Sequence, residues 1–152
     1  MIQTLEKGTD WREVKSIKYR DENGLPVNSP SRPKLTADKV PHLPDRESWD
    51  FDLIRKAYPV GSPGRYSAVV FASRGCPFTC TFCKPLTGKE IRTREIDSII
   101  SEIKYLKEHW NVQYVRFFDE VFIGSKYRIR ALCEAMIEEK LNIFWWCQTQ
   151  VR

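Results

Sequence analysis

The strongest constraint on the fold is an alternation of apolar runs and helical patterns that begins at residue 66. The runs 66–73, 112–118 and 143–147 have the length and apolar character of buried strands. Between them, apolar residues recur at helical spacing: Ile96, Ile99, Ile100, Ile103 and Leu106, then Ile129, Leu132, Cys133, Met136 and Ile137. A strand–helix–strand–helix–strand order predicts an α/β fold with a parallel sheet and right-handed crossovers.

The ends of both helices carry capping signals. Thr93 is predicted to cap the first helix and Ser125 the second, because a side-chain oxygen there can accept a first-turn N–H. Asn142 is predicted to end the second helix, because Asn tolerates the left-handed backbone of a helix terminus.

The first 62 residues have a different character, rich in turns and proline. The strand-like segment 14–19, the turn signal 21–24 and the segment 25–27 together predict a small hairpin. Prolines then interrupt the chain repeatedly, which is typical of a linker. We therefore predict two parts: a hairpin with a Pro-rich linker over 1–62, and an α/β part over 63–152.

Three cysteines follow the first predicted strand in one short loop. Cys76, Cys80 and Cys83 have the spacing C-x3-C-x2-C, with no fourth cysteine nearby. A loop this tight can wrap three thiolates around one corner of an iron–sulfur cluster, because such clusters are held by cysteine sulfur. Three ligands on a four-iron cluster leave one iron open, and an open coordination position is typical of a catalytic site. The loop thus predicts a catalytic iron–sulfur site.

The cysteine loop and its surroundings resemble a known family. The spacing, the aromatic Phe82 before the last cysteine and the preceding strand are similar to the signature of radical S-adenosylmethionine enzymes. The segments 74–78 and 117–122 resemble the branch whose members usually carry a cobalamin-binding domain ahead of the radical domain. The resemblance is good over residues 63–152 and looser before them.

This resemblance implies a fold and a set of cofactor ligands. It implies the first part of a (βα) barrel, with a [4Fe-4S] cluster on Cys76, Cys80 and Cys83. S-adenosylmethionine is expected at the open iron, where its reductive cleavage gives a 5′-deoxyadenosyl radical. Phe82 is expected to pack on the adenine, and Asp119 and Glu120 to hold the methionine ammonium.

Further partners follow from the same resemblance. An electron donor such as a flavodoxin or ferredoxin is expected, and the substrate is not indicated. Cobalamin is implied only for a longer parent protein, because the Asp-x-His-x-x-Gly motif of the branch does not occur here. The family's barrel has six βα units and this chain supplies about two and a half, so we expect an incomplete, weakly active or inactive fragment.

Two other functions use the same cysteines. A zinc-stabilised interaction module needs four ligands, and the fourth would come from Cys147, His42 or His109. An electron carrier is expected to close its cluster with a fourth cysteine, which the loop lacks. Cys133 and Cys147 are interpreted as small core residues on a helix stripe and a strand.

Charge and hydropathy bear on location and partners. The net charge of +5 is spread among acidic residues, so it indicates a solvated surface; a nucleic-acid partner is neither indicated nor excluded. No apolar run approaches the ~20 residues that span a bilayer, and the N-terminus lacks a signal peptide. A cytoplasmic location without membrane attachment is expected, and it suits cysteines that stay reduced.

Overall fold

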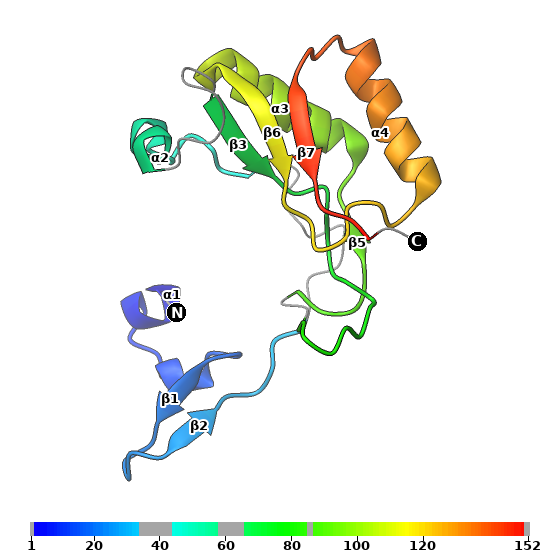
Figure 1. Cartoon of the computed structure of the whole chain (residues 1–152). Helices are drawn as coiled ribbons and strands as arrows, with labels where there is room; N and C mark the ends of the chain where they lie inside the picture. The colour runs from blue at the N-terminus through cyan, green and yellow to red at the C-terminus, as the bar shows by residue number, and fades with distance from the viewer. Residues whose placement is uncertain (1, 34–43, 58–65, 85–86, 151–152) are drawn as a thin grey trace. The chain divides into compact units, whose positions relative to one another are not determined.

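The computed structural model describes residues 2–33, 44–57, 66–84 and 87–150 (Figure 1). It divides into two compact units, Met1–Leu35 and Thr36–Arg152. The two-part organisation predicted with a boundary after residue 62 stays a prediction, because much of the predicted linker, 34–43 and 58–65, lies outside the described residues.

The first unit contains the predicted hairpin. Helix α1 (Ile2–Glu6) and a single 3-10 turn (Trp11–Glu13) precede the antiparallel strands β1 (Lys18–Arg20) and β2 (Pro26–Asn28). The turn between the strands is fixed by Asp21, whose Oδ1 accepts the N–H of Asn23 and of Leu25. The hairpin prediction is confirmed, although its first strand begins at Lys18, later than the apolar pattern indicated.

The second unit is built on a parallel sheet of three strands in the order β3-β6-β7. These strands are β3 (Tyr66–Val70), β6 (Val112–Phe117) and β7 (Phe144–Cys147). Val70 pairs with Phe117, and Phe117 with Cys147, so the carboxyl ends of the three strands meet at one edge. The predicted α/β class and parallel order are confirmed. The sheet has only three strands among the described residues, and the predicted partial barrel stays a prediction.

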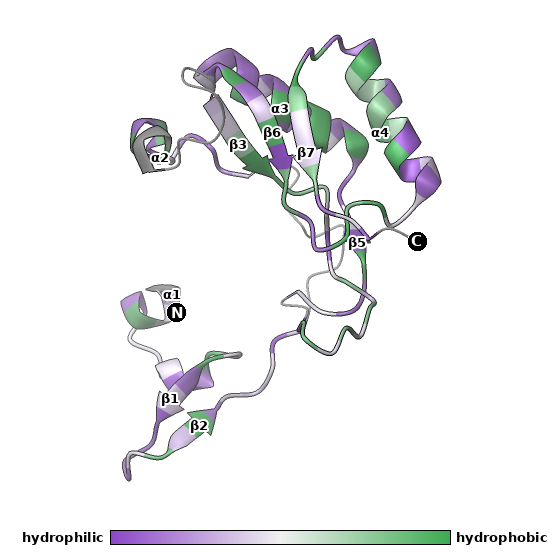
Figure 2. Cartoon of the chain, in the orientation of Figure 1, coloured by the Kyte–Doolittle hydropathy of each residue, from purple (hydrophilic) through white to green (hydrophobic). Residues whose placement is uncertain are grey.

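Two helices pack on one face of this sheet, and Figure 1 shows α3 behind the strands. Helix α3 (Ile96–Trp110) and helix α4 (Lys126–Glu138) bury apolar residues against the strands. The apolar residues of the described chain with no exposed surface are Val70, Ile99, Ile103, Leu106, Val115 and Phe117. Figure 2 shows the mixed character of α4, in which hydrophobic and hydrophilic residues alternate along the ribbon. Both predicted helices are confirmed.

Two of the predicted helix caps are corrected. Glu95 is the N-cap of α3, without a side-chain capping bond, because Thr93 belongs to a strand instead. Ser125 does cap α4 and accepts the N–H of Arg128, as predicted. Helix α4 ends at a cap on Glu139, and the left-handed backbone begins at Lys140, earlier than Asn142.

The first predicted apolar strand is shorter than expected and is followed by a second, unpredicted hairpin. Strand β3 stops at Val70, and β4 (Ser73–Arg74) pairs antiparallel with β5 (Arg92–Thr93). Helix α2 (Phe51–Ala57) packs near the other end of α3, where Phe51 stacks on Trp110 with ring centroids 4.2 Å apart. Within the described residues, no helix is both long and apolar enough to cross a membrane.

Candidate functional site

The cysteine loop lies between β4 and β5, directly beyond the carboxyl end of β3. Cys76 and Cys80 are half-buried and Cys83 is exposed, and all three are free thiols. The Cys83 N–H donates to the Cys80 carbonyl at 3.1 Å, and the Cys76 N–H donates to the Gly88 carbonyl at 3.0 Å. The pairing of β4 with β5 closes the base of this loop. The carboxyl edge of a parallel sheet is where ligand sites form in such folds.

Gly75 is required immediately before the first cysteine. Its φ of +105° is a conformation that other residues rarely adopt. A Cβ built at this position would lie 2.0 Å from the carbonyl oxygen of Glu90. The two arms of the loop therefore approach each other here more closely than any side chain allows.

Asp119 binds the residues that lead into the cysteine loop, Ala72 and Ser73. This residue follows β6 and is 1% exposed. Its carboxylate accepts the Ala72 N–H at 3.2 Å, the Ser73 hydroxyl at 2.7 Å and the Ser73 N–H. Burial raises the pKa of Asp119, and the bonds from Ser73 and Ala72 oppose that rise. Asp119 thus joins the end of β6 to the segment that carries Cys76.

Glu120 contacts the loop one step further along. Its carboxylate accepts the Gly75 N–H at 3.0 Å, and it also accepts the hydroxyl of Thr87 on the returning arm. The residue itself is exposed, unlike Asp119. The neighbouring carboxylates therefore brace both arms of the loop, one from inside the fold and one from its surface.

Two arginines, which the sequence analysis did not single out, complete the base of the loop. Arg94 donates to the Phe71 carbonyl at 2.9 Å, and its backbone N–H donates to Ala72. Arg128 donates to the carbonyl oxygens of Ala72 and Arg94. Burial lowers the pKa of Arg128, and the negative charge of nearby carboxylates opposes that effect.

Arg94 is itself fixed by a buried carboxylate. Glu102 on α3 has no exposed surface, and its Oε2 lies 2.6 Å from Arg94 Nη1. Its other oxygen accepts Arg46 Nε at 2.9 Å, and Arg46 also donates to the Val69 carbonyl at 2.7 Å. The negative charge of this buried carboxylate is compensated by a guanidinium group at each oxygen. Local sequence patterns give no sign of this pairing, because Arg46 and Glu102 are far apart along the chain.

The remaining predicted residues lie at different depths. Phe82, on the loop, is 92% exposed. Among the described residues, no three cysteine, histidine or acidic side chains are drawn together as a metal site. The donor set nevertheless suits an iron–sulfur cluster, because three free thiols occupy one short loop and cysteine thiolates are the usual cluster ligands. The assignments of Phe82, Asp119, Glu120 and the three cysteines stay predictions.

The residues named as a fourth zinc ligand lie elsewhere or are not described. His109 stacks on Tyr105 of α3 with centroids 4.1 Å apart, and its Nδ1 lies 3.1 Å from the Tyr105 carbonyl oxygen. Cys147 packs against the core on β7, where burial raises the pKa of its thiol. His42 lies outside the described residues. The described structure thus brings no fourth ligand to the loop.

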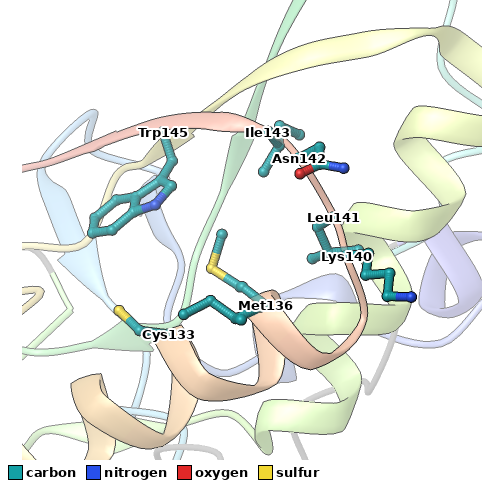
Figure 3. Close-up of a pocket in the computed structure, with 8 residues that line it drawn as sticks. Cys133, Met136, Lys140, Leu141, Asn142, Ile143 and Trp145 are labelled. Carbon is teal, nitrogen blue, oxygen red and sulfur yellow. The ribbon is translucent and has the colours of Figure 1, made fainter.

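A cavity in the second unit is remote from the cysteine loop. A space of about 460 Å³ lies between the end of α4 and the beginning of β7, and Figure 3 shows Cys133, Met136 and Trp145 beside it. Because the strands are parallel, the amino end of β7 is at the edge of the sheet opposite to the cysteine loop. This cavity therefore does not belong to the candidate site.

The whole chain, including the cysteine loop, is similar to known proteins. No family model matches the chain. An uncharacterised methyltransferase of Pyrococcus horikoshii is 30% identical over 99% of this chain and 32% of its own length. The anaerobic magnesium-protoporphyrin IX monomethyl ester cyclase of Rubrivivax gelatinosus is 26% identical over 99% of this chain and 27% of its own length.

A solved structure extends the match to the fold. The cobalamin-dependent S-adenosylmethionine radical enzyme OxsB, with aqua-cobalamin and S-adenosylmethionine bound, matches 95% of this chain with a TM-score of 0.68 and 23% identity. The chain is a relative of the radical S-adenosylmethionine enzymes. Its resemblance to the cobalamin-associated branch is confirmed at the level of the fold. The chain spans about a third or less of these relatives, 32%, 27% and 20% of their lengths.

Proposed function

We propose that this chain is the cluster-binding part of a radical S-adenosylmethionine enzyme. Cys76, Cys80 and Cys83 would hold three irons of a [4Fe-4S] cluster and leave the fourth for S-adenosylmethionine. With both groups bound, the reduced cluster would supply one electron to the sulfonium of S-adenosylmethionine, and cleavage of its C–S bond would give methionine and a 5′-deoxyadenosyl radical. The observation that carries this proposal is the group of three free thiols on one loop whose base is fixed by Asp119, Glu120 and Arg94.

The residues around the loop have separate roles in this proposal. Phe82 would pack against the adenine, and its exposure on the loop supports this role. Glu120 is exposed at the edge of the sheet and carries the charge that suits an ammonium group. Asp119 is buried and already accepts three bonds from the loop, which supports a positioning role within the same site.

The wider setting is part of the same proposal. The loop and sheet would belong to a (βα) barrel, with an electron donor such as a flavodoxin or ferredoxin and a reducing, cytoplasmic location. Cobalamin would be bound by another part of a longer protein. The names of the relatives differ in the reaction they describe, methyl transfer in one and cyclisation in another. The proposal is therefore restricted to the radical chemistry, and the reaction and substrate of the whole protein are not assigned by these names.

Iron content tests the assignment of the ligands. The full chain is reconstituted anaerobically with iron and sulfide, and its iron, sulfide and zinc are measured for wild type and for Cys→Ser variants. Cys76→Ser, Cys80→Ser and Cys83→Ser should each lose the cluster, because each removes one of three ligands. The matched control Cys133→Ser, on α4, should keep it. Full iron in any loop variant would contradict the proposal, and stoichiometric zinc without iron would favour the zinc-stabilised module.

A further inference from the structure

Three aromatic rings and two guanidinium groups contact one another in a row beside the cysteine loop. Arg74 lies over the Phe71 ring, 4.6 Å from its centroid. Phe71 meets Phe118 edge to face, with centroids 6.4 Å apart. Arg116 lies over both Phe118, at 5.9 Å, and Trp146, at 5.3 Å. The row, called here the Arg–aromatic row, begins at Arg74 on β4, passes Phe71 just beyond the end of β3, and continues across β6 to Trp146 on β7.

The row occupies the face of the sheet that the helices do not cover. Neighbouring residues of a strand point to opposite faces. Val115 and Phe117 have no exposed surface and pack with α3, so Arg116 between them points away from the helices. The register pairs Arg116 with Trp146, which places Trp146 on the same face. Figure 1 shows α3 behind these strands, consistent with an uncovered face in front.

The aromatic side chains of this face remain largely exposed to solvent. Phe118 is 48% exposed and Trp146 is 37% exposed. Phe144, two residues before Trp146 on the same face, is 58% exposed. Single exposed apolar residues are common on protein surfaces, whereas a contiguous exposed aromatic patch is typical of a binding site.

The two guanidinium groups in the row have no anionic partner in the described part of the chain. Within the described residues, the guanidinium groups of Arg74 and Arg116 contact aromatic rings, and neither guanidinium has a hydrogen bond or an ion pair. Arg46 and Arg94, by contrast, bind both oxygens of the buried Glu102. Positive charges held over aromatic rings without a carboxylate leave the face complementary to an anion.

We propose that the Arg–aromatic row binds the substrate of the enzyme, and that this substrate is a planar aromatic small molecule with a carboxylate. Its ring system would stack on Phe118 and Trp146, and its carboxylate would accept hydrogen bonds from Arg116 or Arg74. Three strands span about 10 Å, which fits one ring system rather than a row of stacked bases. The proposal rests on the proposed function only in calling the ligand a substrate, since the binding itself involves no cluster residue.

A matched pair of fluorescent probes tests the chemistry. 1-Pyrenecarboxylate and the uncharged 1-pyrenemethanol share one planar ring system and differ in charge. Both are titrated into the full chain without iron, following Trp fluorescence and probe emission. The carboxylate should bind about tenfold tighter than the alcohol, because only it pairs with the guanidinium groups. Equal affinity for the two probes, or no binding of either, would overturn the proposal.

Variants locate the site. Arg116→Gln should bring the affinity for the carboxylate down to that for the alcohol, and Arg116→Lys should restore part of the preference because it keeps the charge. The control Arg130→Gln removes an exposed arginine on α4, 78% exposed, and should leave both affinities unchanged. Circular dichroism confirms that each variant is folded. An unchanged preference in Arg116→Gln would contradict the proposal.

Competition separates the substrate from the cofactor. The variant with serine at positions 76, 80 and 83 should bind 1-pyrenecarboxylate as wild type does, whereas its iron should be lost. Reconstituted Arg116→Gln should retain full iron while it loses the probe, so failure of this inference and failure of the cluster assignment give different results. S-adenosylmethionine should not displace the probe. Displacement by it would overturn the assignment of the row to a substrate.

Discussion

The cysteine loop and the helix-packed core of the same unit are held together by different forces. The core is closed by apolar side chains with no exposed surface, such as Ile103, Val115 and Phe117. The loop buries little of its own: Cys83 and Phe82 are exposed, and its base is fixed by Asp119 and by other charged side chains that bind backbone groups. Hydrophobic burial has no direction, whereas hydrogen bonds to backbone groups fix positions.

This difference explains how a loop with exposed thiols can have a defined shape. Ligands of a cluster must remain accessible, so their loop cannot be stabilised by burying them. The chain instead anchors the residues just before the first cysteine, through Asp119 at Ala72 and Ser73 and through Glu120 at Gly75. Stability and cluster binding should therefore be separable by mutation, and the following variants test that separation.

The largest effect on stability should come from the core. Ile103→Ala leaves a cavity beneath the sheet, at a side chain with no exposed surface, and should lower the free energy of unfolding by about 2–5 kcal/mol. Urea denaturation measures this loss. At a temperature where the variant is folded, its iron content after reconstitution should equal that of wild type. A proportional loss of iron would show that the loop depends on core packing and would break the comparison.

Gly75→Ala tests the loop in the opposite sense. The new Cβ meets the Glu90 carbonyl oxygen and the positive φ is strained, so the two arms of the loop must separate. We expect the free energy of unfolding to fall by about 1–3 kcal/mol and the iron content after reconstitution to fall strongly. Gly24→Ala, at a positive φ in the hairpin of the first unit with open space around it, serves as the matched control. It should keep its iron, and equal iron in both variants would contradict the account.

Asp119→Asn examines the anchor through its pH dependence. Because burial raises the pKa of Asp119 above its ordinary 3.8, the folded chain holds the proton more tightly than the unfolded chain does. The wild-type stability from this group is thus fully present below 3.8 and is lost as the pH rises through the folded pKa. The variant lacks this titration. The stability difference between wild type and Asp119→Asn should therefore grow as the pH falls from neutral toward 3.8, as urea denaturation at several pH values will show.

The opposite slope for Asp119→Asn would mean that the folded state favours the carboxylate. That result would show that the hydrogen bonds from Ser73 and Ala72 outweigh burial in setting the pKa of Asp119. Asn keeps one acceptor oxygen and replaces the other with an NH2 group, so at pH 7 the loss of one acceptor for the Ala72 or Ser73 N–H should cost about 1–2 kcal/mol.

The smallest effect should come from a surface ion pair. Arg130 and Glu134 lie 2.9 Å apart on the exposed side of α4, one turn from each other. Glu134→Gln should change the free energy of unfolding by about 0.3–0.5 kcal/mol, since exposed helix pairs contribute little. Neither iron content nor probe binding should change. A change in either would show that α4 communicates with the loop in a way that its packing does not indicate.

Much of the fold was predictable because its signals are local. Helical spacing of apolar residues identified α3 and α4, and short apolar runs identified the three parallel strands. The β4–β5 hairpin escaped prediction because each strand has two residues, too short for any periodic pattern. The same hairpin explains the wrong N-cap: Thr93 pairs with Ser73 and is not available to begin α3.

The position of the cysteine loop was predictable from the sequence, and the side chains that support the loop were not. The cysteine spacing is a local signal, so the loop could be located from the sequence. Asp119 and Glu120 were singled out as acids at a strand end, but no local pattern says that one turns inward to Ser73 and the other outward to Gly75. Arg94, Arg128 and Glu102 were missed because charged residues usually indicate a solvated surface, and their partners are distant in sequence.

The most direct test of the central claim is electron paramagnetic resonance of the reduced, reconstituted chain with and without S-adenosylmethionine. Three cysteine ligands on a four-iron cluster leave one iron open, so the account predicts a [4Fe-4S] signal that changes when S-adenosylmethionine is added. The signal should be absent from the variant with serine at positions 76, 80 and 83. A four-iron signal that is identical with and without S-adenosylmethionine would contradict the claim that this loop presents an open iron.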